Sequence, residues 1–118
     1  MIYDKTRRKV LSASPRVARS FWDRLRGMIG RDFACTPFDA MIFERCSAIH
    51  TCGMKIPIDV IFLDRQNRIC RVVTSLPPWR FAMGGSAAFS VIEMPAGKAA
   101  EYGAMAGDEV EFLSTPAE

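Results

Sequence analysis

The stretch SAIHTCGMKIPIDVIFLD, residues 47–64, contains side chains whose types and spacing could support chemistry. It holds His50, the chain's single histidine, two residues before Cys52 and nine before Asp59. A histidine beside a thiol can form a nucleophilic dyad oriented by a carboxylate, or can supply two metal ligands. A further acid, Glu93, lies in the apolar run FSVIEM. Asp59 or Glu93 could instead work as a general acid or base, with His50 assisting.

Strand geometry disfavours a metal site built from Cys46, His50 and Cys52. On one continuous strand the two cysteines lie about 20 Å apart at roughly 3.3 Å per residue. Zinc ligands lie about 2.0–2.3 Å from the ion, so only His50 and Cys52, about 6.6 Å apart along the strand, could share one. We therefore expect no metal and no cofactor, with His50 and Cys52 as the candidate metal pair.

Strand alternation places each acid on an apolar face, because Asp59 in IDVIFL and Glu93 in FSVIEM both alternate with apolar residues. A buried charge is costly unless it is paired, so each acid needs a partner. We expect Arg26 to pair with one of them in a partly enclosed polar pocket. The alternative is a structural role, in which a buried ion pair or a cap holds the fold together.

One helix and six or seven strands are predicted to position these residues. In SPRVARSFWDRLRGMIGR, Ser14 suits an N-cap and Pro15 a first helical position. Apolar residues follow at helical spacing (Val17, Phe21, Leu25 and Met28), and Gly27 or Gly30 could end the helix. The predicted strands are RRKVLSA, AMIFE, CSAIHT, PIDVIFLD, ICRVVTS, AFSVIEM and one near the C-terminus, with LPPWRFAMGGSA as a long loop.

These elements predict a mainly β fold, a small antiparallel barrel or jelly-roll-like sandwich with one flanking N-terminal helix. The length of 118 residues suits a single domain over residues 1–118. No apolar run is long enough to span a bilayer or to read as a secretory signal. The four cysteines lack repeated CxxC spacing, which together with the missing signal predicts a reduced, cytoplasmic protein.

Three ordered blocks resemble one family: RLRGMIGR, IHTCGMKIPIDVIFLD and VIEMPAGKAAEYGAMAGDEV. Over residues 20–113 the chain resembles the bacterial family called domain of unknown function 192. The matching positions are Arg26, Gly27, Met28, Met54, Pro57, Ile58, Asp59, Glu93, Met94, Pro95, Ala96, Gly97, Gly107 and Asp108. The resemblance implies a small barrel or jelly roll with a flanking helix, and it implies no activity.

One position departs from the family pattern. Where the family has a large aromatic residue, this chain has Cys52. A cysteine or metal mechanism through Cys52 is therefore not an activity that the family shares. His50 fits an IHT variant found in part of the family, which implies at most a subgroup role. Among the other matching positions, Gly27, Pro57, Pro95, Gly97, Gly107 and Asp108 are interpreted as structural.

Three functions from different classes follow from these residues. The favoured interpretation is a non-enzymatic module that binds a small molecule or peptide in a polar pocket between the helix and the loops 53–57 and 76–85. Its expected binding residues are Arg26, Met54, Trp79, Phe81 and Met83. The alternatives are a hydrolase-like or other acid–base enzyme using Asp59 or Glu93 with His50, and a binder of RNA or an anionic surface.

The third alternative depends on a charge asymmetry. Residues 1–31 carry nine Lys or Arg residues against two Asp residues, whereas the whole chain has a net charge of only +3. Such a basic segment can contact nucleic acid or an anionic membrane surface. The aromatic stacking platform of a single-strand binder is missing, however, because only Tyr3, Phe21 and Trp22 accompany the charges. The pattern therefore favours a solvated basic face and no nucleic-acid partner.

Overall fold

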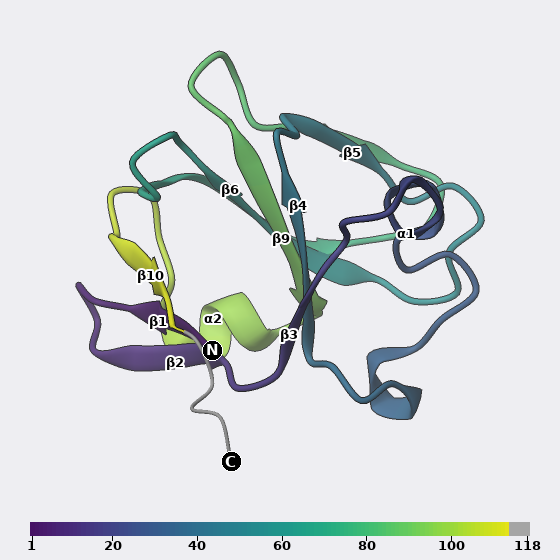
Figure 1. Ribbon diagram of the computed structural model, residues 1–118, viewed down its shortest axis with the longest axis horizontal. Coiled ribbons are helices and arrows are strands. Elements are labelled where there is room, and N and C mark those ends of the chain that lie inside the picture. Colours follow the sequence, from purple (N-terminus) through teal and green to yellow (C-terminus); the bar gives the residue numbers. More distant parts are fainter. Residues whose placement is uncertain (114–118) are drawn as a thin grey trace.

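Residues 1–113 are described by the computed structural model, and strands dominate their regular structure (Figure 1). The strands are β1 (Ile2–Asp4), β2 (Lys9–Ser12), β3 (Pro15–Val17), β4 (Ala40–Glu44), β5 (Ala48–His50), β6 (Ile58–Leu63), β7 (Ile69–Leu76), β8 (Phe81–Met83), β9 (Ser90–Pro95) and β10 (Val110–Phe112). The helices are α1 (Phe21–Arg26), α2 (Lys98–Tyr102) and the 3-10 turn η1 (Phe33–Cys35). The predicted mainly β class is confirmed. No helix within these residues has the length and apolar character needed to cross a bilayer.

A five-stranded sheet in the order β3-β4-β9-β6-β7 forms the centre of the fold. A second sheet, β10-β1-β2, lies with α2 on one side of it, and the two-stranded ribbon β5-β8 lies with α1 on the other (Figure 1). Strands β3 and β4 are parallel, whereas the other strand pairs are antiparallel, as predicted. Because β3 and β7 remain edge strands, the central sheet is not closed into a barrel. Of the two predicted forms, the sandwich therefore describes the molecule better than the barrel.

Both faces of the central sheet are buried, since β6 is buried at every position and β9 at all but the last. On the α1 side, Val60 and Val91 pack in one core with Met28. On the α2 side, Ile61 and Ile92 pack in a second core, which reaches the three-stranded sheet. Strands buried on both faces have nearly continuous apolar sequences, as these do. Alternation along each strand therefore assigns a residue to one core or the other.

The predicted N-terminal helix is much shorter than expected. Ser14 and Pro15 do not start it, because Pro15–Val17 form β3, paired in parallel with Ala40–Ile42 of β4. Helix α1 begins after Ser20, whose side chain accepts a hydrogen bond from the Asp23 backbone N–H. No residue of α1 is buried. The prediction of a buried apolar helix face is therefore wrong within α1, where the large apolar side chains Phe21, Trp22 and Leu25 are exposed.

Besides β3, two further strands were missed by the sequence prediction. Strand β1 lies before the first predicted strand and pairs with both β2 and β10. Strand β8 lies inside the segment predicted as a long loop and pairs with β5, placing His50 opposite Phe81. The adjacent prolines of that segment precede β8 and stay outside the ladder, as their missing N–H groups require.

Gly84 follows β8 at a position with no room for a side chain. A Cβ atom there would lie 2.4 Å from the Ala88 Cβ and 2.5 Å from the Phe62 Cδ1, and Phe62 is fully buried. We expect Gly84→Ala to lower the free energy of unfolding by about 2–3 kcal/mol, because the neighbours are tightly packed. Urea denaturation measures this loss. The control Ser86→Ala, at an exposed position of the same loop, is expected to change stability by less than about 0.5 kcal/mol.

Candidate functional site

Glu93 lies in the middle of the central sheet. Its strand, β9, pairs with β4 and β6, which places Glu93 beside Met41 and Val60. The residue is 4% exposed, and its Oε2 atom has no hydrogen-bond partner among residues 1–113. The great majority of buried polar side-chain atoms have a partner, so this one requires an explanation.

A small cavity of about 130 Å³ borders the Glu93 carboxyl group. The segment from Arg24 to Ile29 forms one wall, and β5 with Met54 forms the opposite one. Gly27 lies next to the carboxyl group, because a Cβ at this position would lie 4.0 Å from Glu93 Oε2 and 3.3 Å from the Phe43 ring. Gly27 also has a φ of +49°, which disfavours other residues. A glycine therefore forms part of the cavity lining where α1 ends.

Burial raises the pKa of Glu93 to about 8. A carboxyl group with this pKa is mostly protonated at neutral pH, so it can donate a hydrogen bond as well as accept one. Arg24 and Arg26 line the same cavity, yet the Arg24 Nη1 donates to the Glu44 carbonyl at 2.7 Å and the Arg26 Nε to the Ile29 carbonyl at 3.5 Å. Contrary to expectation, Arg26 forms no ion pair with either acid in the described part of the chain.

Asp59 lies on the opposite face of the central sheet from Glu93. In the β6–β9 ladder Asp59 pairs with Met94, whereas Glu93 pairs with Val60. Each Asp59 oxygen accepts one backbone hydrogen bond at 2.8 Å, Oδ1 from Ser75 and Oδ2 from Ala99 in the first turn of α2. Asp59 is fully buried and both of its oxygens are engaged. Its geometry is that of a structural cap, and it cannot share a site with Glu93.

His50 is exposed and lines the Glu93 cavity from β5. Its Nδ1 accepts a hydrogen bond from the Cys52 backbone N–H at 3.3 Å, and its ring centroid lies 6.2 Å from that of Phe81. Within residues 1–113 no three His, Cys, Asp or Glu side chains come together as metal ligands. The pair His50–Cys52 thus has no third ligand among them.

The predicted binding residues divide into two groups. Met54 is buried and lines the Glu93 cavity together with Arg26. Trp79, Phe81 and Met83 are 66–78% exposed and lie on or before β8, outside the cavity lining. The sequence interpretation missed the exposed α1 side chains Phe21, Trp22 and Leu25. Charged neighbours in FWDRLR were a signal that this stretch is open to solvent.

The residues interpreted as structural occupy turns and ends of elements. Gly97 is the N-cap of α2, with a φ of +93°, and Gly107 has a φ of +97°. Pro57 directly precedes β6 and Pro95 is the last residue of β9. Asp108 is buried, and its carboxylate accepts hydrogen bonds from the Arg7 side chain at 3.1 Å and from the Met105 backbone N–H at 3.2 Å.

Fold and cavity together define a small, mainly β domain whose sheet presents a buried acid, with one oxygen unpartnered among residues 1–113, to a pocket beside a short helix. The family model DUF192, described as "Uncharacterized ACR", matches residues 3–112. The chain belongs to this family.

Proteins from two archaea are similar in sequence. A UPF0127 protein of Thermococcus sibiricus is 30% identical over 115 residues, covering 95% of this chain and 74% of its own. Another, from Pyrococcus abyssi, is 36% identical over 104 residues, covering 83% of this chain and 85% of its own. The family is therefore not confined to bacteria, which corrects the expectation drawn from the resemblance.

Two crystal structures have a similar fold. One is a protein of unknown function from Novosphingobium aromaticivorans, with a TM-score of 0.70, 24% identity and coverage of 83% of this chain and 74% of its own. The other, from Sinorhizobium meliloti, is described as a proposed transcription regulator and has a TM-score of 0.72, 20% identity and coverage of 82% and 79%. At these identities the likeness establishes the shared fold alone.

Proposed function

We propose that this protein is a non-enzymatic binding module whose Glu93 cavity receives a carboxylate group, carried by a small molecule or by a peptide. The observation that carries the proposal is the buried Glu93 Oε2 atom, which has no partner within residues 1–113 and lies beside a cavity. A buried polar atom left unpaired costs roughly 1–3 kcal/mol. A ligand that completes its hydrogen bonding removes this cost and gains affinity.

The size and charge of the cavity favour a carboxylate. Its volume of about 130 Å³ equals about four water molecules at roughly 30 Å³ each, enough for a carboxylate on a short stem. A protonated Glu93 would donate a hydrogen bond to one ligand oxygen. Arg24 and Arg26 in the wall would favour a negative charge by electrostatic attraction.

Exposed apolar side chains near the cavity would contact the remainder of a larger ligand. Leu25 of α1 lines the cavity and is 57% exposed, and Phe21 and Trp22 are exposed on the same helix. On the other side of the cavity, Phe81 and Met83 are exposed on β8, the strand paired with β5. Clustered exposed aromatic and methionine side chains are typical of surfaces that contact other molecules.

Titration with propionate, followed by amide chemical shifts in NMR spectra, tests the proposal. We expect saturable shifts at Gly27, Ile49 and Met54, with propionate binding more tightly than the neutral isostere propionamide. The affinity should fall as the pH rises through about 8, because an ionised Glu93 repels the ligand. Glu93→Gln should still bind propionate but lose this pH dependence, since an amide donates at every pH.

A second variant separates the Glu93 carboxyl group from the shape of the cavity. Glu93→Met keeps the approximate volume of the side chain but removes its donor, so we expect propionate binding to fall at least about tenfold. Glu111→Gln, at an exposed acid on β10, should bind as the unmodified protein does. Unchanged binding by Glu93→Met, or tighter binding of propionamide than of propionate, would contradict the proposal.

An acid–base enzyme is the second candidate function. The raised pKa of Glu93 and the presence of His50 in the same cavity support it, because catalytic acids are commonly tuned toward neutral pH by burial. Asp59 is not part of this candidate, since both of its oxygens are engaged. Hydrolysis of p-nitrophenyl acetate that requires Glu93 and His50, and survives Glu111→Gln, would favour the enzyme over the binding module.

A further inference from the structure

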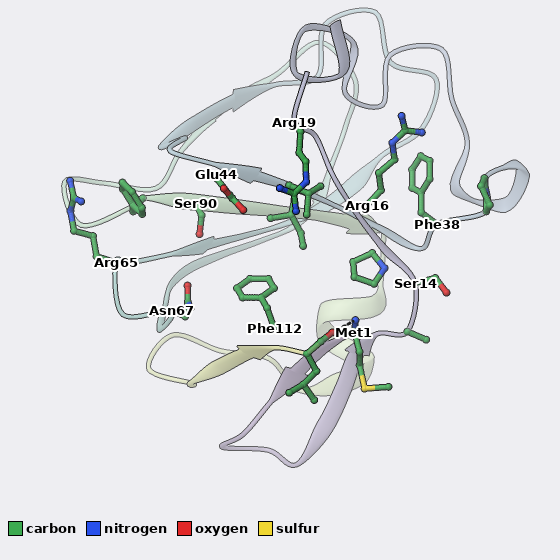
Figure 2. A pocket seen from close by; sticks show the side chains of 17 residues that line it. Met1, Ser14, Arg16, Arg19, Phe38, Glu44, Arg65, Asn67, Ser90 and Phe112 are labelled. Carbon is green, nitrogen blue, oxygen red and sulfur yellow. Dashed lines mark hydrogen bonds between the residues drawn. The ribbon is translucent and has the colours of Figure 1, made fainter. Parts of the chain in front are cut away.

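A second concave region separates the three-stranded sheet from the central sheet, on the side of the molecule away from the Glu93 cavity. Its volume is about 890 Å³, within the roughly 300–1,000 Å³ typical of ligand sites. Figure 2 shows Phe112 and Met1 facing Arg19 and Glu44 across this space, with Arg65 at one end and Arg16 at the other. We call this region the inter-sheet cleft.

The walls of the inter-sheet cleft combine apolar and polar side chains, and the apolar ones come from both sheets. The central sheet contributes Val17 of β3 and Ile42 of β4, and Phe89 lies just before β9. The three-stranded sheet contributes Phe112 of β10, followed by Leu113. These side chains could enclose an apolar body larger than the Glu93 cavity can hold.

The charged groups of the inter-sheet cleft are mainly positive, with three arginines against one acid, Glu44. The Arg16 guanidinium is paired with Asp23 at 3.1 Å. The Arg65 guanidinium lies over the Phe89 ring, 4.3 Å from its centroid, in a cation–π contact that orients it beside the apolar wall. Arg19 forms no hydrogen bond or ion pair through its side chain with residues 1–113, and it points toward the cleft in Figure 2.

From this combination we infer that the inter-sheet cleft binds an amphipathic carboxylate, with its apolar body between the sheets and its carboxylate on the guanidinium group of Arg19. Guanidinium groups bind carboxylates through paired hydrogen bonds, and Arg19 uses none of its side-chain donors within residues 1–113. Glu44 would disfavour a dianion, so a single negative charge on an apolar body fits best. This site is separate from the Glu93 cavity and does not depend on the function proposed for it.

Titration with 2-naphthoate, compared with 2-naphthylmethylamine, tests this inference by amide chemical shifts. The two probes share an aromatic body and carry opposite charges. We expect 2-naphthoate to shift the amides of Val17, Ile42 and Asn67 with a Kd of about 0.1–1 mM, at least about tenfold tighter than the amine. Equal affinity of the two probes, or shifts confined to the α1–β5 region, would overturn the inference.

A variant of Arg19 tests the group that holds the carboxylate. Arg19→Gln should weaken 2-naphthoate binding by about five- to tenfold, because it removes the charge-assisted contact. The matched control Arg80→Gln, an exposed arginine between β7 and β8, should leave the affinity unchanged. Loss of affinity in both variants to the same extent would indicate nonspecific charge attraction and overturn the assignment. These exposed substitutions are not expected to disturb folding.

Discussion

The Asp59→Asn variant is expected to be less stable than the unmodified protein by about 3 kcal/mol, measured as the free energy of unfolding in urea. The carboxylate of Asp59 accepts a backbone hydrogen bond on each oxygen, from Ser75 and from Ala99, both at 2.8 Å. An asparagine has one acceptor oxygen, so its NH2 group must face one of these N–H donors. One buried N–H then loses its partner and two donors oppose each other.

Asp64→Asn is the matched control for this change. Asp64 also accepts two backbone N–H groups, from Gln66 and Arg68, but both hydrogen bonds go to the same oxygen in a solvent-exposed turn. Asparagine can keep both of them, so we expect a loss below about 1 kcal/mol. Hydrogen exchange at the Ala99 amide should accelerate in Asp59→Asn alone. Equal stabilities of the two variants would contradict the structural role assigned to Asp59.

The strands were well predicted where short-range pattern decides the structure. AMIFE matches β4, and the alternation in IDVIFL and FSVIEM correctly placed each acid among apolar neighbours. What alternation could not reveal is that Asp59 and Glu93 face different cores. Both faces of β6 and β9 are buried, so neither face is marked by polar residues, and only the register between the strands separates the acids.

The N-terminal helix shows the opposite case, in which a long-range contact overrides local pattern. The spacing of Val17, Phe21, Leu25 and Met28 fits a helix, and Pro15 suits a first helical position. In the fold, Pro15–Val17 pair with β4, some 25 residues later in the chain. Tertiary contacts routinely override weak local helix propensity in this way.

The candidate site was predicted in part, as a polar group beside the helix and the loop 53–57. Arg26, Met54, His50 and Glu93 all line the Glu93 cavity. The sequence could not predict that Arg26 pairs with neither Asp59 nor Glu93 within residues 1–113. That outcome depends on the direction of the Arg26 side chain, which turns to the Ile29 carbonyl where α1 ends. The inter-sheet cleft had little sequence signal beyond the basic segment that contains Arg16 and Arg19, since its lining comes from both ends of the described chain and from strands between them.

A stability curve against pH should identify Glu93 as the titrating group of the core. Its pKa is raised from 4.5 to about 8 by burial, so the folded protein keeps a proton that the unfolded chain releases across this interval. The stability associated with Glu93 is therefore fully present below about pH 4.5 and is lost progressively as the pH rises toward 8. We expect a loss of about 3–4 kcal/mol between pH 5 and pH 8, at a slope of at most about 1.4 kcal/mol per unit.

Glu93→Gln should remove this dependence, because an amide does not titrate in the interval. The difference in unfolding free energy between Glu93→Gln and the unmodified protein should grow with pH, whereas that for the exposed control Glu111→Gln should stay constant. Parallel curves for all three proteins would contradict a raised pKa at Glu93. At neutral pH, we expect the protein to be more stable with a neutral residue of similar size at position 93 than with the natural glutamate. A loss of stability caused by retaining an acid at the cavity is what the proposed binding function predicts, since contacts with a ligand would then complete the hydrogen bonding of Glu93 Oε2.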